Sequence, residues 1–150
     1  MKTMPSTPAR TLTPTAIAQP TGRVHPTAIV HPKAKLGKGV VVGPYAVIDE
    51  NVSIGDGTTV MHGAHLTGWT RIGEKNEIHI GAVIGHAPQD RSYNGARSEV
   101  IIGNRNIIRE YVTIHRGASP DSATMIGNDN FFMGATHIAH NCVIGNHVTI

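Results

Sequence analysis

The chain has 150 residues, which is room for one domain built around one core. Aromatic residues make up only 4% of it, glycine occurs 17 times, and Val and Ile dominate the aliphatic residues, so β structure is favoured over a helical bundle. The single cysteine, Cys142, excludes an internal disulfide, and no apolar run approaches the roughly 18 residues of a membrane span. We therefore expect a cytoplasmic protein without an integral membrane segment.

The net charge of +3 comes from the segment 1–23, which holds Lys2, Arg10 and Arg23 and no acidic residue. From Val24 onward the numbers of basic and acidic residues are equal. A neutral body gives no electrostatic reason to expect a nucleic-acid partner.

Residues 1–23 are rich in Thr, Pro, Ala and Ser and show no hydrophobic period. Such a segment cannot bury enough apolar surface to offset the entropy of ordering it, so we predict a disordered N-terminal extension. An organelle transit peptide is the alternative, because acidic residues are absent. Four prolines and only two arginines argue against an amphipathic targeting helix.

From Val24 the chain can be written in groups of six, with a large apolar residue first and often a glycine second. The fifth residue of each group is usually small or slim. The first positions are Val24, Val30, Leu36, Val42, Ile48, Ile54, Val60, Leu66, Ile72, Ile78, Ile84, Ile102, Ile108, Ile114, Ile126, Phe132, Ile138, Ile144 and Ile150. The exceptions are Asp90, Ala96 and Pro120, which predict two excursion loops near residues 86–100 and 116–124.

A helix would place apolar residues three and four apart, and a simple strand would place them two apart. A strict period of six instead predicts short strands joined by turns, with one large side chain pointing inward in each group. Stacked units of this kind form a parallel β-solenoid, here over residues 24–150, in which each coil buries its face against the next coil. Ordinary sandwich strands would not keep such a column over this length.

The pattern resembles the hexapeptide repeat of left-handed β-helix acyltransferases. In that family three groups of six make one triangular coil, which implies an all-β, left-handed parallel β-helix of about seven coils. The left hand is implied by the resemblance, since the general rule for parallel crossovers predicts the opposite hand.

Most of the ten histidines lie at turn or outward positions, where a solvated surface residue is the simplest interpretation. These are His25, His31, His62, His65, His79 and His147. His137 and His140 flank the inward residue Ile138, so His137 points outward and His140 lies where the strand turns. The residues alone leave two interpretations open for this pair, a functional site or two solvated side chains.

Four longer runs closely resemble the signature of the UDP-N-acetylglucosamine O-acyltransferase family. They are Ile84-Gly-His-Ala-Pro-Gln-Asp-Arg-Ser-Tyr-Asn-Gly95, Ile108-Arg-Glu-Tyr-Val-Thr-Ile-His-Arg-Gly117, Gly127-Asn-Asp-Asn130 and His137-Ile-Ala-His-Asn-Cys142. The resemblance implies transfer of a (3R)-hydroxyacyl chain from acyl carrier protein to the sugar 3-hydroxyl, the first step of lipid A biosynthesis.

The resemblance implies that His140 is the general base, a role that suits imidazole because its ordinary pKa lies near working pH. It also implies residues that hold the sugar nucleotide or line the cleft. These are Gln89, Asp90, His115 and His137. No covalent acyl-enzyme, metal or cofactor is implied, because the phosphopantetheine of the carrier protein holds the acyl group. Cys142 is then a small corner residue.

In the family the cleft lies between subunits of a homotrimer, and the first excursion loop reaches toward a neighbour. Acyl carrier protein is acidic, so basic residues near the site offer it complementary charge, although solvation explains them equally well. These are Arg91, Arg97, Arg109 and Arg116.

The chain departs from the family pattern in three places. Asn141 stands where the family usually has Asp, which removes carboxylate support for His140, and Ser92 stands where a lysine is common. The family also continues with further coils and a helical domain beyond the position of Ile150. We therefore expect a truncated N-terminal portion of such an enzyme.

Three alternatives remain. The first is a solenoid that only binds a partner without catalysis, and the second is the related N-acyltransferase, although Gln89 and Asp90 match the O-acyltransferase better. The third is a γ-type carbonic anhydrase with zinc held by three histidines. His79 and His115 are six groups of six apart, which predicts two coils of separation on one face, but Pro120 occupies the position of the third ligand.

Overall fold

The computed structural model describes residues 23–150, and within them every regular element is a short β-strand. The predicted extension over residues 1–23 lies outside this range except for Arg23. The 17 strands are β1 (Ile29–Val30), β2 (Lys35–Leu36), β3 (Val41–Val42), β4 (Val47–Ile48), β5 (Val52–Ile54), β6 (Thr59–Val60), β7 (His65–Leu66), β8 (Trp69–Ile72), β9 (Glu77–Ile78), β10 (Val83–His86), β11 (Glu99–Ile102), β12 (Ile107–Ile108), β13 (Thr113–His115), β14 (Ala123–Ile126), β15 (Phe131–Phe132), β16 (His137–Ile138) and β17 (Val143–Ile144).

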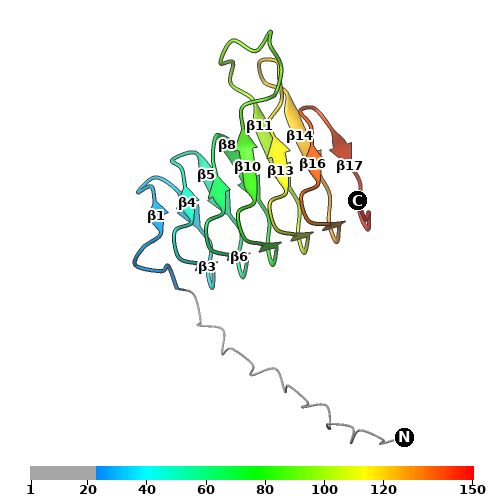
Figure 1. The fold of residues 1–150 in the computed structure, drawn as a ribbon. Helices are drawn as coiled ribbons and strands as arrows, with labels where there is room; N and C mark the ends of the chain where they lie inside the picture. The colour runs from blue at the N-terminus through cyan, green and yellow to red at the C-terminus, as the bar shows by residue number, and fades with distance from the viewer. Residues whose placement is uncertain (1–22) are drawn as a thin grey trace, which may run out of the picture.

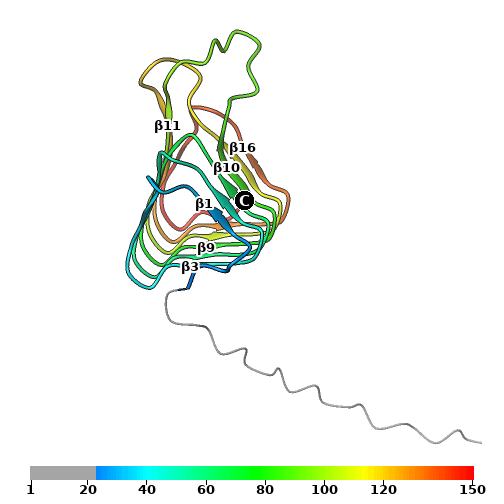
Figure 2. The same ribbon diagram turned by 90° about the vertical axis from the view of Figure 1, so that its left-hand side faces the viewer.

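The strands form the three walls of a solenoid, and all strand pairs are parallel. One sheet has the order β1-β4-β7-β10-β13-β16, the second β17-β14-β11-β8-β5-β2, and the third β15-β12-β9-β6-β3. Each strand therefore pairs with the third strand along the chain, which is one coil away. Figure 2 looks along the stack and shows the triangular outline of the coils. With six strands in two walls and five in the third, the described residues make about six turns, close to the seven expected.

The register identifies where the chain leaves the solenoid. Val47 pairs with His65, three groups of six further along the chain, as one regular coil requires. Val83 pairs with Thr113, five groups further on, and Thr113 pairs with His137, four groups further on. The extra groups leave at the same corner, between β10 and β11 and between β13 and β14. Figure 1 shows the two loops rising side by side from that edge.

The inward residues of successive coils form one continuous hydrophobic core. From Val42 to Ile138 the inward residues of the regular groups are buried, and the largest fully buried side chain is that of Phe132. At the two ends of the described stack the inward residues Val24 and Ile150 are 42% and 41% exposed. Cys142 packs against this core from a corner.

One corner of the solenoid is held together by a column of polar side chains inside it. Thr58, Asn76, Asn106 and Asn130 stack one above another and are all buried. The Asn106 backbone and side-chain N–H groups donate to Asn76 Oδ1 at 2.9 and 3.0 Å. Its own Oδ1 accepts from the Asn130 backbone and side chain at 3.0 and 2.9 Å. Each asparagine therefore links one coil to the next within the core.

Candidate functional site

A cluster of histidines forms where the first wall meets the excursion loops. His115, the last residue of β13, is 6% exposed. Its ring lies 4.9 Å from that of His137 on β16, nearly perpendicular to it, and 6.0 Å from that of His86 at the end of β10. These side chains come from three neighbouring strands of one sheet, so the parallel register brings them together.

Burial and nearby basic side chains favour the neutral form of His115. Desolvation is the main cause that lowers the pKa of His115, and electrostatic interactions with His137, His86, His140 and Arg116 lower it further. The buried Nδ1 of His115 has no hydrogen-bond partner among the described residues. His137 is exposed, and its Nδ1 lies 2.7 Å from the hydroxyl of Thr113.

His140 lies half-buried at the turn after β16. Its Nδ1 is 2.9 Å from the side-chain oxygen of Asn141, which stands where the resembled family usually has a carboxylate. His140 also lies within electrostatic range of His115 and of Asp90 in the first excursion loop, because its charge contributes to the pKa of both groups. A half-buried imidazole with Nδ1 hydrogen-bonded to a neighbouring side chain suits proton transfer through its other ring nitrogen.

The first excursion loop brings a carboxylate to this cluster. Asp90 Oδ1 accepts hydrogen bonds from the Ser92 hydroxyl at 2.7 Å and from the Ser92 backbone N–H at 2.8 Å. These two bonds are the main reason why the pKa of Asp90 is lowered, with a smaller contribution from His140. Ser92, which replaces a lysine common in the family, thus fixes the Asp90 carboxylate. Gln89 beside it is exposed.

Arg116 fastens the first loop to the solenoid. Its Nη1 donates to the carbonyl of Gly85 at 2.8 Å and its Nη2 to the Tyr93 hydroxyl at 3.0 Å. The Tyr93 hydroxyl in turn donates to the carbonyl of Ala96 at 2.8 Å. Arg116 therefore has a role in holding the loop, whereas the sequence left it as either a charge for an acidic partner or a solvated side chain.

The structure thus brings together His115, His137, His140 and Asp90, while Gln89 lies at the exposed surface of the loop that carries Asp90. Sequence reasoning missed His86 as a member of the cluster. Spacing alone could not find it, because His86 pairs with His115 across a register shift between β10 and β13, and the two residues are not separated by a whole number of sixes.

The expectation that His79 and His115 stack on one face is wrong. The first excursion lengthens one coil from three groups of six to five, so a separation of six groups no longer equals two coils. His79 follows β9 on the third wall, and His115 lies in β13 on the first. Among residues 23–150 no three His, Cys, Asp or Glu side chains are placed to hold a metal ion.

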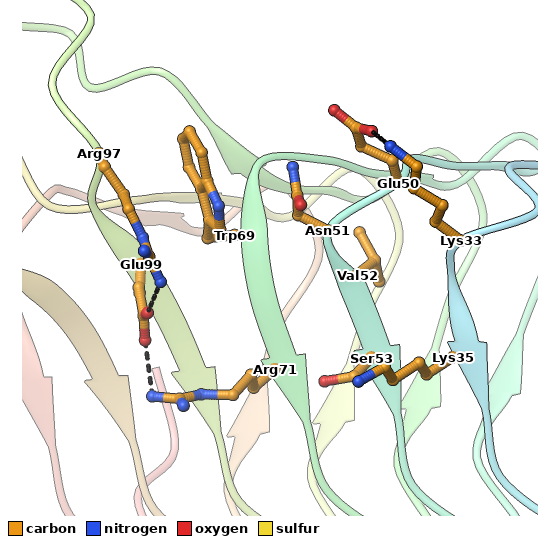
Figure 3. Close-up of a pocket in the computed structure, with 10 residues that line it drawn as sticks. All are labelled: Lys33, Lys35, Glu50, Asn51, Val52, Ser53, Trp69, Arg71, Arg97 and Glu99. Carbon is orange, nitrogen blue, oxygen red and sulfur yellow. Dashed lines mark hydrogen bonds and ion pairs between the residues drawn. The ribbon is translucent and has the colours of Figure 1, made fainter.

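A separate hollow of about 360 Å³ lies on the outer surface around β5, β8 and β11 (Figure 3). Four basic and two acidic side chains line it, around the indole of Trp69. Glu99 faces both Arg71 and Arg97 in Figure 3, at 2.6 and 3.5 Å. Arg97, which the sequence offered as a basic residue for an acidic partner, lines this hollow, whereas none of the predicted catalytic or sugar-binding residues does.

The comparisons with known proteins agree with the fold and the motifs, although no protein-family profile matches the chain. The acyl-[acyl-carrier-protein]–UDP-N-acetylglucosamine O-acyltransferase of Thermodesulfovibrio yellowstonii is 49% identical over 115 residues, covering 76% of this chain and 45% of the relative. That of Syntrophobacter fumaroxidans is 46% identical over 117 residues, covering 77% and 45%. The chain thus spans about half the length of these curated relatives.

Solved structures give the same result. A UDP-N-acetylglucosamine acyltransferase from Bacteroides fragilis superposes with a TM-score of 0.82 and 43% identity, covering 85% of this chain and 50% of that one. A structure of the corresponding protein from Acinetobacter baumannii gives 0.81 and 41%, covering 84% and 49%.

The fold and the repeat define the class of protein, an all-β left-handed parallel β-helix of the hexapeptide-repeat type, and the predicted fold class is confirmed. Within that class the chain is similar to the UDP-N-acetylglucosamine O-acyltransferases, and the family resemblance inferred from the sequence motifs is confirmed over the matched residues. The described part of the chain contains no helix that is both long and apolar enough to cross a membrane.

Proposed function

We propose that this chain is the catalytic β-helical portion of an acyltransferase that moves a (3R)-hydroxyacyl group from acyl carrier protein to the 3-hydroxyl of UDP-N-acetylglucosamine. The observation that carries the proposal is His140, a half-buried imidazole whose Nδ1 is hydrogen-bonded to Asn141 Oδ1 at 2.9 Å. Relatives named for this reaction share 46–49% of the matched residues.

The chemistry needs one base and no covalent intermediate. His140 removes the proton of the sugar 3-hydroxyl as its oxygen attacks the thioester carbonyl, and the phosphopantetheine sulfur leaves. The proton that His140 has accepted then goes to the leaving thiolate. A positioned base of this kind contributes about 10²–10⁴-fold to the rate, and orientation of the two substrates supplies the rest.

The neighbouring side chains have binding roles in this proposal. Asp90, whose carboxylate is fixed by Ser92, and Gln89 contact the sugar nucleotide from the loop. His137 and the neutral His115 line the same cleft, and a homotrimer in the cytoplasm completes it. Burial lowers the pKa of His115, and its neutral form can both donate and accept a hydrogen bond there.

The proposal is tested by an acyl-transfer assay with UDP-N-acetylglucosamine and a hydroxyacyl carrier protein. His140→Ala should lower kcat by about 10²–10⁴-fold, because the base is removed while the fold is retained. Calorimetric titration with UDP-N-acetylglucosamine should still detect binding, since His140 acts on the reaction more than on affinity.

The matched control is His62→Ala, which removes an exposed histidine of the same solenoid and should leave turnover unchanged. Near-normal turnover of His140→Ala would disprove the base. A wild-type chain that folds but binds no UDP-N-acetylglucosamine would favour the non-catalytic solenoid. Acyl transfer to an amino group of the acceptor, with none to the 3-hydroxyl of UDP-N-acetylglucosamine, would favour the N-acyltransferase.

A further inference from the structure

We infer that Asn141 is a positioning residue that holds His140 in the tautomer with the proton on Nδ1, which leaves Nε2 as the basic nitrogen. The tautomer is a property of the His140 ring in the folded chain. Its consequence for catalysis rests on the proposed function.

The orientation of the Asn141 amide is fixed by the protein backbone. The Ala118 backbone N–H, in the second excursion loop, donates to the Asn141 side chain at 3.0 Å. A backbone N–H can only donate, so the atom that faces it must be the amide oxygen and not the amide nitrogen. The two ends of an amide side chain are similar in shape, and this contact decides between them.

The same oxygen then decides the tautomer of His140. Asn141 Oδ1 lies 2.9 Å from His140 Nδ1, and a carbonyl oxygen can only accept. His140 must therefore donate from Nδ1, and in the neutral ring the lone pair is on Nε2. One oxygen accepts both bonds, so the Ala118 N–H and the imidazole are coupled through it.

The backbone of Asn141 is also fixed by its surroundings. Its backbone has φ 63°, in the left-handed region that asparagine tolerates better than most residues. Its N–H donates to the Thr124 hydroxyl at 2.9 Å, and that hydroxyl donates to the carbonyl of His115 at 2.6 Å. Both the backbone and the side chain of Asn141 are thus fixed, and the His140 ring is fixed by them.

The amide differs from a carboxylate in charge. An aspartate at this position would also accept from Nδ1, but it would stabilise the protonated ring as well. With Asn141, the carboxylate that interacts electrostatically with His140 is Asp90 in the first loop, and His140 also interacts with His115. The neutral amide therefore selects the tautomer without favouring the imidazolium ion.

The test is a measurement of the His140 ring nitrogens by NMR, with ¹⁵N-labelled histidine in the whole chain and assignment by His140→Gln. At a pH where the ring is neutral, we expect the Nδ1-protonated tautomer in the wild type. Asn141→Gly, which suits the left-handed backbone, should shift the population toward Nε2–H. Asn141→Asp should retain Nδ1–H.

Ala135→Gly is the matched control, because Ala135 also has φ 63°. The substitution increases backbone freedom in the same way as Asn141→Gly but removes no side-chain amide. It should leave the His140 signals unchanged. A wild-type ring found mainly as Nε2–H would overturn the inference, and so would an Asn141→Gly ring that keeps the wild-type tautomer.

Kinetics separate this inference from the proposed function. If the correct tautomer falls to about a tenth of the population in Asn141→Gly, kcat should fall about tenfold with KM little changed. Asn141→Asp should move the acidic limb of the kcat/KM profile to higher pH. A wild type that shows the expected tautomer but no acyl transfer would refute the proposed function and leave the tautomer assignment standing. An altered tautomer with unchanged kcat would refute the catalytic consequence.

Discussion

The glycine that follows the inward aliphatic residue is required by the distance between neighbouring coils. A Cβ atom built on Gly55 would lie 2.6 Å from the carbonyl carbon of Gly73 and 2.8 Å from the backbone nitrogen of Glu74. Real Cβ atoms essentially never come this close to backbone, so the coils would have to separate. Gly145 occupies the same place in the column but has nothing within 4 Å of its Cβ position.

This pair provides a direct test at the scale of one residue. Gly55→Ala should lower the free energy of unfolding by about 1–3 kcal/mol, the usual cost of overpacking a rigid site. Gly145→Ala should be neutral within about 0.5 kcal/mol or slightly stabilising, because it adds the same methyl group to open space. Urea unfolding of both variants measures the difference, and equal losses would show that close approach of the coils is not the cause.

The asparagine column is a hydrogen-bonded stack of side chains from neighbouring coils that are far apart in the sequence. Asn76, Asn106 and Asn130 replace the small residues that the hexad pattern predicts at a corner, and each is buried. Asn106 also donates to the carbonyl of Gly127 at 3.0 Å, so it bonds to the coils on both sides. Buried amides of this kind are stabilising only while every partner is present.

Replacing Asn106 with Val should therefore cost about 2–4 kcal/mol, because the backbone N–H of Asn130 and the carbonyl of Gly127 lose their partner inside the protein. Asn106→Thr should cost about half as much. Thr58 shows why, since its hydroxyl both accepts from the Asn76 backbone N–H at 3.1 Å and donates to the carbonyl of Gly73 at 2.9 Å.

Thermal and urea unfolding of the two variants provide the comparison, because Thr and Val have nearly the same shape and differ in the hydroxyl. Equal stability of Asn106→Thr and Asn106→Val would mean that hydrogen bonding in the column does not stabilise the fold.

The column also marks a limit of sequence reasoning. The period of six locates the corner, but an asparagine there looks like a surface residue until its partners one coil away are known.

Across the whole molecule, the sequence was most informative where interactions repeat between neighbouring coils. The inward column from Val42 to Ile138 follows from spacing alone, since each coil repeats the same burial. Contacts made by the excursion loops do not repeat, so spacing could not show that Arg116 would bind Tyr93, or that Ser92 would fix Asp90. The first loop also explains why the predicted stacking of His79 and His115 was wrong, because it lengthens the coil between them.

The histidine cluster also makes the stability of the whole molecule depend on pH. Burial lowers the pKa of His115 below its ordinary value of about 6.5, and electrostatic interactions with His137, His86, His140 and Arg116 add to this. The unfolded chain therefore binds the proton of this residue more readily than the folded chain. Linkage then requires stability to be fully present above pH of about 6.5 and to fall as the pH drops from there toward the lower pKa of the folded state.

Thermal unfolding between pH 7.5 and 5.5 measures this effect. The wild type should lose stability over this range, and His115→Phe should lose less, because it keeps a buried ring but has no group to protonate. The comparison is between pH values within each variant, so the cost of the substitution itself cancels. His62→Phe, at an exposed position, should keep the wild-type slope.

Loss of stability near pH 4 has a different origin and does not affect the comparison. The pKa values of Asp90, Glu110 and Asp129 are lowered, the first and third mainly by side-chain hydrogen bonds and the second mainly by a backbone hydrogen bond. Their contribution is present above the ordinary carboxyl pKa of about 4 and is lost only below it. An equal slope for His115→Phe and the wild type between pH 7.5 and 5.5 would show that the buried His115 is not what couples folding to pH in this range.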